Sequence, residues 1–429
     1  MNVVRFIETK RDGRAHTKAE LAEFCRLVGH GAIPDYQVSA WLMAAFLNPL
    51  SDEEAASLTE GMADSGERLD LTGLPEPWVD KHSTGGIGDK TTLVVVPLLA
   101  ACGLTIVKMS GRGLGITGGT IDKLESVPGF RTDLSPAELK AQAMAVGIGL
   151  GGQTANLAPA DKHLYALRDV TGTTASMPLM ASSILSKKVA GGAKYVVLDV
   201  KAGRGAFMTT EDGARELAKL LVRIGEGAGL HTTALISDMD VPLGSAVGNA
   251  VEVREAWDVL TGKDLIGPVK RFRELCVTLT AHVLTVVGED PETAQKRAEA
   301  CLTSGAAWEK AERWLIAQGA ERHLLLPVAP DIVTVNAAEA GWVADIHPVQ
   351  ISQLVLDLGG GRKTKSDQID HRVGIELLAS VGDQLAKGQP LLRVHAATPD
   401  AAENAAGGAL AAISFSSEPV APRAVIRPS

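Results

Sequence analysis

Short apolar runs that end in polar residues recur through the middle of this chain, and helical stretches lie between some of them. Tyr195 to Val200 precedes Lys201, and Thr233 to Ile236 precedes Ser237 and Asp238. Short strands that alternate with helices are typical of a mainly parallel sheet with helices on both faces. This α/β pattern constrains the fold most. It also predicts a ligand site beyond the carboxyl ends of the strands, where the polar residues fall.

Helical patterns come before this region, and a β-rich pattern comes after it. Capping boxes that begin at Thr17 and Ser51 open two amphipathic segments, and a third segment runs from Pro34 to Leu47. Beyond about Pro327 the residues alternate in polarity, and segment 332–347 is typical of a solvent-facing strand. We therefore predict an all-helical start and a β-rich end.

Composition excludes several classes of protein. Lys plus Arg number 42 against 51 Asp plus Glu in 429 residues, and no basic block interrupts this mild acidity, so a nucleic-acid partner is not expected. The longest nearly apolar stretch, Leu93 to Val107, is shorter than the ~18 residues of a membrane-spanning helix and contains Pro97 and Gly103. The first residues lack the apolar core of a secretory signal. We expect a cytoplasmic protein without a membrane partner.

The first glycine-rich segment, residues 80–92 with the sequence DKHSTGGIGDKTT, predicts a phosphate-binding loop. It is superficially similar to a Walker A loop, but Asp89 interrupts the required GK[ST]. Backbone N–H groups near glycines, together with hydroxyls and an ammonium, can bind a phosphate oxyanion. The alternative is a tight turn with solvated polar residues. The side chains suited to phosphate are those of Lys81, Ser83, Thr91 and Thr92.

The second glycine-rich segment, residues 108–120 with the sequence KMSGRGLGITGGT, contains a literal GxGxxG. A dinucleotide-binding helix would open within that motif and run for about three turns, whereas Pro128 interrupts the chain soon afterwards. Hydroxyls of Ser110 and Thr120 flank the glycines, so we interpret the segment as a second anion-binding turn. A third segment, 359–363, is interpreted as a loop or a contact between domains.

A separate group of donors comes from Arg168 and from residues 181–189, with the sequence ASSILSKKV. If these residues are helical, Ser183 and Lys187 lie on one face, four residues apart. Arg168 adds a planar fork of N–H donors. Such donors suit the carbonyl oxygens of a base that gains negative charge as it leaves. The alternative for each cation is a solvated position on the surface.

These segments together resemble the thymidine and pyrimidine-nucleoside phosphorylase family. The likeness is carried by DKHSTGGIGDKTT, KMSGRGLGITGGTIDKLESVPGF and GQTANLAPADKHLYALRDVT, and it runs almost end to end. Ile116 stands where the family usually has histidine. The resemblance implies a pentosyltransferase of pyrimidine salvage, which converts uridine, thymidine or deoxyuridine and phosphate reversibly into the free base and (deoxy)ribose 1-phosphate.

The fold that the resemblance implies is a small all-helical domain hinged to a large mixed or parallel-sheet α/β domain, with a β-rich α+β domain at the C-terminus. The helical domain would span 1–65 and continue at about 160–190. The α/β domain would span 70–158 and 195–330, and the C-terminal domain 331–429. A homodimer is also implied.

The resemblance assigns a role to residues of both glycine-rich segments and of the donor group. Phosphate, the co-substrate, would be bound by Lys81, His82, Ser83, Thr92, Lys108, Met109, Ser110 and Thr120. The nucleoside would be bound by His82, Lys108, Arg168, Ser183 and Lys187. The catalytic residues would be His82, Arg168 and Lys187, as donors to the departing base. No organic cofactor is implied.

The resemblance implies two further expectations, one about substrate range and one about a structural metal ion. Lys108 predicts that ribonucleosides are accepted, because its ammonium can hydrogen-bond a 2'-hydroxyl; the alternative is a thymidine phosphorylase restricted to 2'-deoxynucleosides. Some relatives bind a structural potassium ion, and Lys90 is unusual at that site: its ammonium could instead occupy the cation's place and pair with Glu255. The potassium ligands implied are Gly88, Lys90, Leu243, Ala246 and Glu255.

Two other functions compete with this one. An anthranilate-type phosphoribosyltransferase also has a glycine-rich loop and opens with a helical domain, but it needs a magnesium-pyrophosphate site and does not explain the β-rich unit. A carrier module is the other, because residues 381–396 are similar to biotinyl-type hairpins. Lys387 lacks the MKM-type surroundings that modification requires, so a packing role is preferred for that hairpin.

Overall fold

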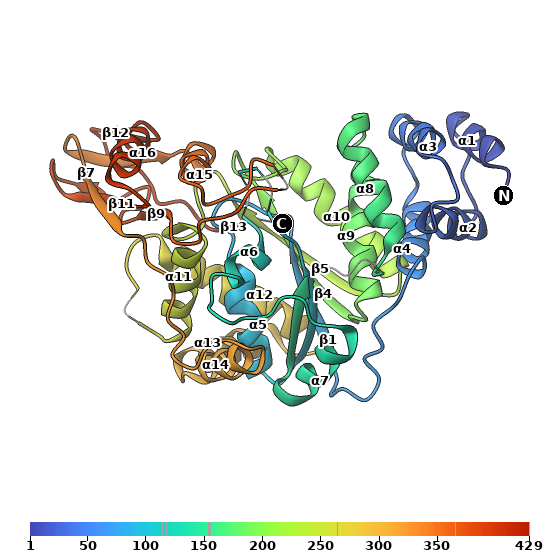
Figure 1. The fold of residues 1–429 in the computed structure, drawn as a ribbon, viewed down its shortest axis with the longest axis horizontal. Helices are drawn as coiled ribbons and strands as arrows, with labels where there is room; N and C mark the ends of the chain where they lie inside the picture. Colours follow the sequence, from blue (N-terminus) through green and yellow to red (C-terminus); the bar gives the residue numbers. More distant parts are fainter. Residues whose placement is uncertain (114, 117, 153–155, 264, 365, 429) are drawn as a thin grey trace.

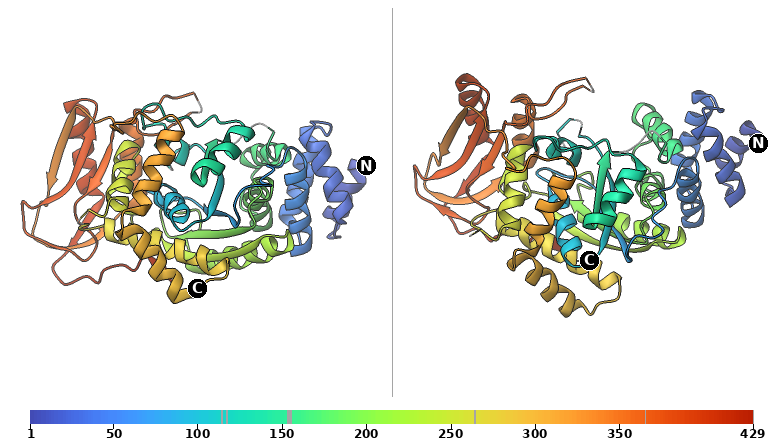
Figure 2. Two further views of the ribbon diagram at one scale, coloured as in Figure 1. Left: turned by 90° about the horizontal axis from the view of Figure 1, so that it is seen from below. Right: turned by 60° about the horizontal axis from the view of Figure 1, so that its bottom comes forward.

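The computed structural model describes residues 1–113, 115–116, 118–152, 156–263, 265–364 and 366–428. A helical bundle and a β-rich unit lie at opposite ends of the long axis, with a mainly parallel sheet between them (Figure 1). The same order of parts is seen from below and from an intermediate angle (Figure 2). The fold class expected from the sequence is therefore confirmed.

The central sheet has six strands in the order β13-β5-β4-β1-β2-β3. The first five strands along the chain pair in parallel, and β13 adds antiparallel to β5. The chain proceeds from β1 outward to β3 and then returns to β4 on the other side of β1. This reversal is the position where open α/β sheets bind ligands. The strands are β1 (Trp78–Ser83), β2 (Thr105–Ser110), β3 (Ile148–Gly152), β4 (Tyr195–Ala202), β5 (His231–Asp238) and β13 (Ile426–Arg427).

The polar residues predicted to follow the strands lie within their final residues. Parallel pairing continues to Ser83, opposite Asp199, and to Ser110, opposite Gly152. The predicted apolar runs end at Val200 and Ile236, whereas β4 and β5 continue to Ala202 and Asp238, because backbone pairing with a buried neighbour does not require apolar side chains. The side chains of β1 and β2 that could bind a ligand therefore stand on a rigid backbone.

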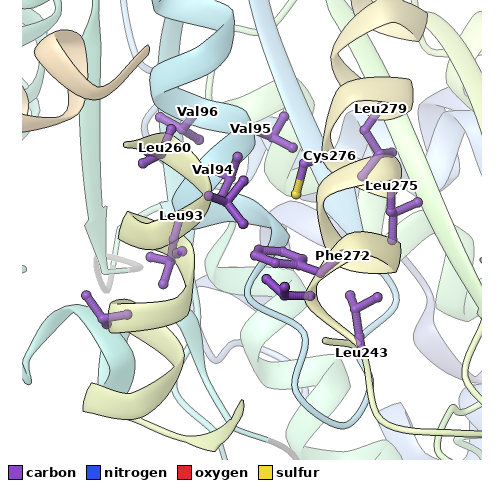
Figure 3. Packing of buried hydrophobic residues seen from close by; sticks show 14 of the residues in the cluster. Leu93, Val94, Val95, Val96, Leu243, Leu260, Phe272, Leu275, Cys276 and Leu279 are labelled. Carbon is purple, nitrogen blue, oxygen red and sulfur yellow. The ribbon is translucent and has the colours of Figure 1, made fainter. Parts of the chain in front are cut away.

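Apolar helices cover one face of the sheet. Leu93 to Val96 of α5 (Thr91–Ala101) pack with Phe272 and Cys276 of α12 (Val269–Val286) and with Leu260 of α11 (Ala250–Leu260) (Figure 3). Helix α5 is apolar on all sides, as expected for a helix buried between neighbours. The other helices of the α/β part are α6 (Thr120–Leu124), α7 (Pro136–Val146), α10 (Glu211–Gly227), α13 (Pro291–Thr303) and α14 (Ala306–Ala317).

The helical bundle joins the start of the chain to a later segment. Both predicted capping boxes are present, at Thr17 and Ser51. Helix α9 contacts α4, and α8 contacts α2 and α3. The bundle consists of α1 (Val3–Arg11), α2 (Lys18–Gly29), α3 (Asp35–Leu47), α4 (Asp52–Asp64), α8 (Pro159–Thr171) and α9 (Met177–Ala190).

The segments that link bundle and sheet run side by side. The backbone N–H of Glu67 donates to Asn156 over 2.9 Å, and that of Leu69 donates to Ala190 over 2.8 Å. At Gly66 a Cβ atom would lie 2.0 Å from the carbonyl oxygen of Asn156, so only glycine allows this approach. These segments join the bundle to the sheet along the chain, and helices α4 and α9 of the bundle also pack against α10 of the α/β part.

The β-rich unit contains two small sheets, β10-β8-β12 and β6-β9-β11-β7. Segment 332–347 forms two strands in different sheets, not one, and the alanine-rich stretch after residue 398 forms a helix. Strand β6 (Ala246–Gly248) lies in the chain of the α/β part, whereas β13 comes from the C-terminus, so the two parts exchange strands. The remaining elements are β7 (Asp331–Asn336), β8 (Gly341–Ile346), α15 (Pro348–Asp357), β9 (Gly374–Leu377), β10 (Gln384–Leu385), β11 (Pro390–Ala396), α16 (Pro399–Ala411) and β12 (Ile413–Ser416).

Within the described residues, the helices are all too short or too polar to cross a lipid bilayer.

Candidate active site

A cleft of about 270 Å³ opens at the carboxyl ends of β1 and β2, next to the reversal in strand order. Both glycine-rich segments contribute to it, and α9 forms part of its wall. The predicted site residues that line it are His82, Ser83, Thr92, Lys108, Met109, Ser110, Thr120 and Lys187. Four further residues that line the cleft were not predicted: Asp89, Arg112, Ile184 and Lys188. The GDKTT motif at residues 88–92 and the SKK motif at residues 186–188 could have pointed to Asp89 and Lys188.

Lys81 lies directly beneath the cleft and does not line it. Its side chain is 1% exposed, and its ammonium donates to the hydroxyl of Thr91 at the start of α5. A carboxylate oxygen of Asp199 is 3.8 Å away. The ammonium of Lys81 therefore adds positive charge below the N-terminus of α5, where the helix dipole also favours an anion.

Arg168 and Ser183 are held within the helical bundle, outside the cleft. The guanidinium of Arg168 donates to the carbonyl oxygens of Thr174 over 2.8 Å and Leu179 over 3.2 Å. The hydroxyl of Ser183 accepts from Lys187 over 3.1 Å, which confirms that these two residues share one helical face. Of Arg168, Ser183 and Lys187, it is Lys187 that lines the cleft in the present arrangement, next to Lys188.

Asp80 connects two buried lysines at the base of the cleft. Its Oδ1 atom is 3.0 Å from the ammonium of Lys108 on β2, and its Oδ2 atom is 2.6 Å from the ammonium of Lys188 on α9. Burial alone would raise the pKa of Asp80, but these two ammonium groups outweigh it and hold the pKa below its ordinary value. Because α9 belongs to the bundle, this carboxylate also ties the bundle to the sheet.

Burial and neighbouring lysine charges lower the pKa values of two groups in the cleft. Burial lowers the pKa of Lys108 to about 7, and nearby lysine ammoniums add to this shift while Asp80 opposes it. Burial, followed by the charges of the surrounding lysines, holds the pKa of His82 well below its ordinary value. A neutral imidazole can still donate one hydrogen bond. The cleft is thus an electropositive site in which His82 is uncharged near neutral pH.

Two hydroxyls in the cleft have contrasting surroundings. The hydroxyl of Ser83 donates to a carboxylate oxygen of Asp89 and accepts from the N–H of Gly85 over 3.1 Å. The hydroxyl of Ser110 is buried and has no hydrogen-bond partner within the described residues. A buried polar group without a partner costs about 1–3 kcal/mol, so Ser110 is suited to a ligand that supplies an acceptor.

The C-terminal unit holds the second glycine-rich segment in place. The carbonyl oxygen of Arg362 accepts from the N–H of Gly115 over 2.9 Å, and its guanidinium donates to Asp122 over 2.7 Å. The other carboxylate oxygen of Asp122 accepts from the N–H of Gly113 over 2.7 Å. The interpretation of segment 359–363 as a contact between domains is confirmed.

The residues implied as potassium ligands come together, but they do not fit a potassium ion. The ammonium of Lys90 lies where their oxygens converge: 3.1 Å from Gly88, 2.7 Å from Leu243 and 2.8 Å from Ala246, all through carbonyl oxygens. Its distance from Glu255 Oε2 is 2.7 Å. The position that a cation would take is therefore filled by a charged group of the chain itself.

Three family models match the chain and define its class. The model described as "Glycosyl transferase family, helical bundle domain" matches residues 4–66, and "Glycosyl transferase family, a/b domain" matches residues 75–308. "Pyrimidine nucleoside phosphorylase C-terminal domain" matches residues 342–416. The crystal structure of anthranilate phosphoribosyltransferase from Thermus thermophilus shares the fold, with a TM-score of 0.58 and 18% identity over 74% of this chain and 99% of that one. Fold and site define a glycosyl transferase.

Curated relatives give a closer assignment. The pyrimidine-nucleoside phosphorylase of Bacillus subtilis is 48% identical over 403 residues, which are 92% of each chain. That of Geobacillus stearothermophilus is 46% identical over 402 residues, again 92% of each chain, and that of Staphylococcus epidermidis is 46% identical over 407 residues, 93% of each chain. The chain belongs to the pyrimidine-nucleoside phosphorylase family.

Proposed function

We propose that this enzyme catalyses the reversible phosphorolysis of pyrimidine nucleosides. A phosphate oxygen bonds to C1' of the sugar as the bond from C1' to the base nitrogen breaks, and the electron pair of that bond leaves with the base. The products are the free base, after it gains a proton, and (deoxy)ribose 1-phosphate. One observation carries the proposal. The hydroxyl of Ser110 is buried in a cleft lined by lysines and has no hydrogen-bond partner among the described residues.

Phosphate is placed against the two glycine-rich segments. Thr92 in the first turn of α5 and Thr120 at the start of α6 line the same cleft as Ser110. Lys81 contributes charge from below, and Ser83 reaches phosphate by releasing Asp89. Binding in a confined site aligns the phosphate oxygen with C1' and raises its effective concentration.

The base is placed toward α9, where Lys187 lines the cleft. Negative charge develops on the base as it departs, so a donor that interacts more strongly with the departing base than with the substrate lowers the barrier. Lys187 and His82 supply such donors from different walls of the cleft. Arg168 and Ser183 would join them when the bundle moves toward the sheet, with Arg168 exchanging its backbone carbonyl partners for carbonyl oxygens of the base.

The sugar lies between these two groups, next to Lys108. An adjoining hollow of about 430 Å³ shares Ser110 and Arg112 with the cleft and enlarges the space open to a nucleoside. The ammonium of Lys108 can donate to a 2'-hydroxyl, so we propose that uridine is accepted alongside thymidine and deoxyuridine. Potassium has no place in the proposal, because Lys90 fills its position.

The proposed assembly is a homodimer in the cytoplasm, and it rests on the family resemblance together with an exposed apolar face. Tyr36, Met43 and Leu47 of α3 are 74%, 39% and 70% exposed, at spacings that place them on one side of the helix. Val4 on α1, which contacts α3, is 55% exposed. Exposed apolar clusters of this kind are typical of protein interfaces. Light scattering on Leu47→Glu would show a monomer if this face forms the dimer.

A single assay tests the reaction. Purified protein is incubated with uridine or thymidine, with and without phosphate, and free base is followed by absorbance or chromatography. We expect base to appear only when phosphate is present, and Ser110→Ala to raise the KM for phosphate about tenfold through the loss of one hydrogen bond to a charged group. Base release at the same rate without phosphate, or no release at all, contradicts the proposal.

A further inference from the structure

The ammonium of Lys90 sits in an oxygen cage that would suit a metal cation. Three backbone carbonyl oxygens and one carboxylate oxygen lie 2.7 to 3.1 Å from its nitrogen, and its side chain is fully buried. The ring of Phe272 adds a cation-π contact at 5.1 Å. An ammonium has only three N–H donors, so four oxygens at these distances share them. The cage is arranged around a point of positive charge.

Two glycines make the cage possible. At Gly244, with φ +75°, a Cβ atom would lie 2.3 Å from a carboxylate oxygen of Glu255 and 3.0 Å from the Lys90 nitrogen. At Gly88, with φ +71°, a Cβ atom would lie 2.8 Å from the carbonyl oxygen of Leu243. The left-handed backbone and the close approach both require glycine. The backbone conformation therefore directs the three carbonyl oxygens toward the Lys90 ammonium.

Glu255 balances the charge from the far side of the cage. One of its carboxylate oxygens accepts from the N–H of Ser245 over 2.7 Å, and the other accepts from that of Ala246 over 2.8 Å. Burial raises the pKa of Glu255, and the ammonium of Lys90 opposes that rise. Without a positive charge at this point the carboxylate would be buried and uncompensated.

We propose that Lys90 is a covalently attached substitute for a bound monovalent cation, so that this protein needs no potassium or sodium ion to fold or to act. The tethered charge joins the first glycine-rich segment to the loop before β6 and to α11. A free ion would have to be bound from solution, whereas the lysine is present in every molecule. The charge therefore stays in place at any ionic composition.

The proposal predicts that removing the lysine side chain creates a cation site. Lys90→Ser leaves room in the cage, adds a hydroxyl oxygen as a further ligand, and places a favoured residue at the N-cap position of α5, which has no side-chain cap at present. A hollow lined by Ser245, Ala246 and Glu255 offers an ion a route to the cage. A ligand that binds only the folded state raises Tm with its concentration.

The experiment measures Tm of the full-length protein in KCl, NaCl and tetramethylammonium chloride at equal ionic strength. The parent protein should have the same Tm in all three salts and the same rate of phosphorolysis. Lys90→Ser should have a lower Tm in tetramethylammonium chloride, with a saturable gain in KCl. Lys90→Met, which fills the cage without charge, should have a lowered Tm and no gain.

A matched control breaks another buried ion pair. Lys10→Ser removes the ammonium that lies 2.9 Å from Glu54 in the helical bundle, where both side chains are at most 5% exposed. That ammonium has only Glu54 as a hydrogen-bond partner in the described part of the chain, so we expect a lower Tm that is equal in all three salts. A potassium-specific gain in Tm or rate for the parent protein overturns the proposal. So does a Lys90→Ser variant that gains nothing from potassium or fails to fold in it.

Discussion

Asp80 holds the ammonium of Lys108 at 3.0 Å beneath the cleft, and both side chains are almost completely buried. Neither group is free to reorient, because the same carboxylate also binds Lys188 at 2.6 Å and accepts from the backbone N–H of Lys81 over 2.7 Å. The position of Lys108 next to the proposed sugar site is therefore set by a residue that does not line the cleft. Asp80 acts as a positioning residue.

Replacing Asp80 by Asn should damage both stability and uridine turnover. Two buried ammonium groups lose their counter-charge, which costs about 3–5 kcal/mol in the free energy of unfolding. Because Asp80 raises the pKa of Lys108 against the effect of burial, the pKa should fall further in the variant. We expect the alkaline limb of kcat/KM for uridine to move to lower pH.

The measurement is kcat/KM against pH for uridine, alongside urea denaturation. Glu76→Gln, which removes the carboxylate from an exposed pair with Lys194, serves as the control and should leave both unchanged. A variant Asp80→Asn that is destabilised but keeps the parental pH profile would show that Asp80 supports the fold without positioning the charge on Lys108.

Lys108→Met should change substrate choice. The thioether removes the donor to a 2'-hydroxyl and leaves contacts to a 2'-deoxy sugar largely intact. Loss of a hydrogen bond from a charged donor corresponds to about 1.5–3 kcal/mol, so kcat/KM for uridine should fall at least about tenfold while that for thymidine changes little. Competition between the two nucleosides in one reaction measures the ratio directly. An unchanged ratio would contradict a role for Lys108 in recognising the sugar.

The same substitution gives a prediction for stability against pH. Burial lowers the pKa of Lys108 to about 7 in the folded protein, whereas a lysine in an unfolded chain titrates near about 10.4. Between these values the unfolded chain holds a proton that the folded chain has released, so this group makes the folded state more stable as pH rises. The contribution of this group to the slope of the free energy of unfolding against pH is at most about 1.4 kcal/mol per pH unit.

Denaturation of the parent and Lys108→Met between about pH 7 and 9.5 tests this sign. The free energy of unfolding of the parent minus that of Lys108→Met should increase with pH, because methionine does not titrate. A difference that stays constant over this range would mean that the Lys108 ammonium keeps its ordinary pKa in the folded protein.

The fold and the cleft could be predicted because the residues that signal them lie close together in the sequence. Glycines that free backbone N–H groups, hydroxyls at the start of α5, and strands that alternate with helices all leave marks within about 20 residues. Segments 80–92 and 108–120 were recognised in this way, and the cleft forms where they meet.

Contacts between segments that are far apart in the sequence could not be predicted from such local patterns. Lys187 and Lys188 are adjacent and chemically identical, yet the first contacts Ser183 and Asp161 within the helical bundle and the second reaches Asp80 on β1. Successive helical residues differ in direction by about 100°, so only the packing of α9 decides which lysine is buried. The pairing of Arg362 with Asp122, which is 240 residues away, could not be predicted from local sequence patterns either.

Arg362→Ala should weaken phosphate binding from outside the cleft. The guanidinium holds Asp122, which in turn accepts from Gly113 in the second glycine-rich segment. Loosening that segment should raise the KM for phosphate about three- to tenfold while the KM for thymidine changes little. Lys363→Ala is the neighbouring control, since its ammonium pairs with Asp357 at an exposed position. Equal changes in both KM values would point to general destabilisation of the C-terminal unit.

His82 should act as a neutral hydrogen-bond donor throughout the neutral pH range. Burial and lysine charges hold its pKa well below the ordinary value, so the imidazole carries no extra proton to release between about pH 6 and 8. His82→Gln keeps an N–H donor and should retain part of the activity, whereas His82→Ala should lose about 10² in kcat. Since kcat/KM reports groups of the free enzyme, the ratio of parent to His82→Gln for thymidine should be constant across this range. A ratio that rises toward acid with a midpoint near about 6.5 would show instead that an imidazolium protonates the departing base.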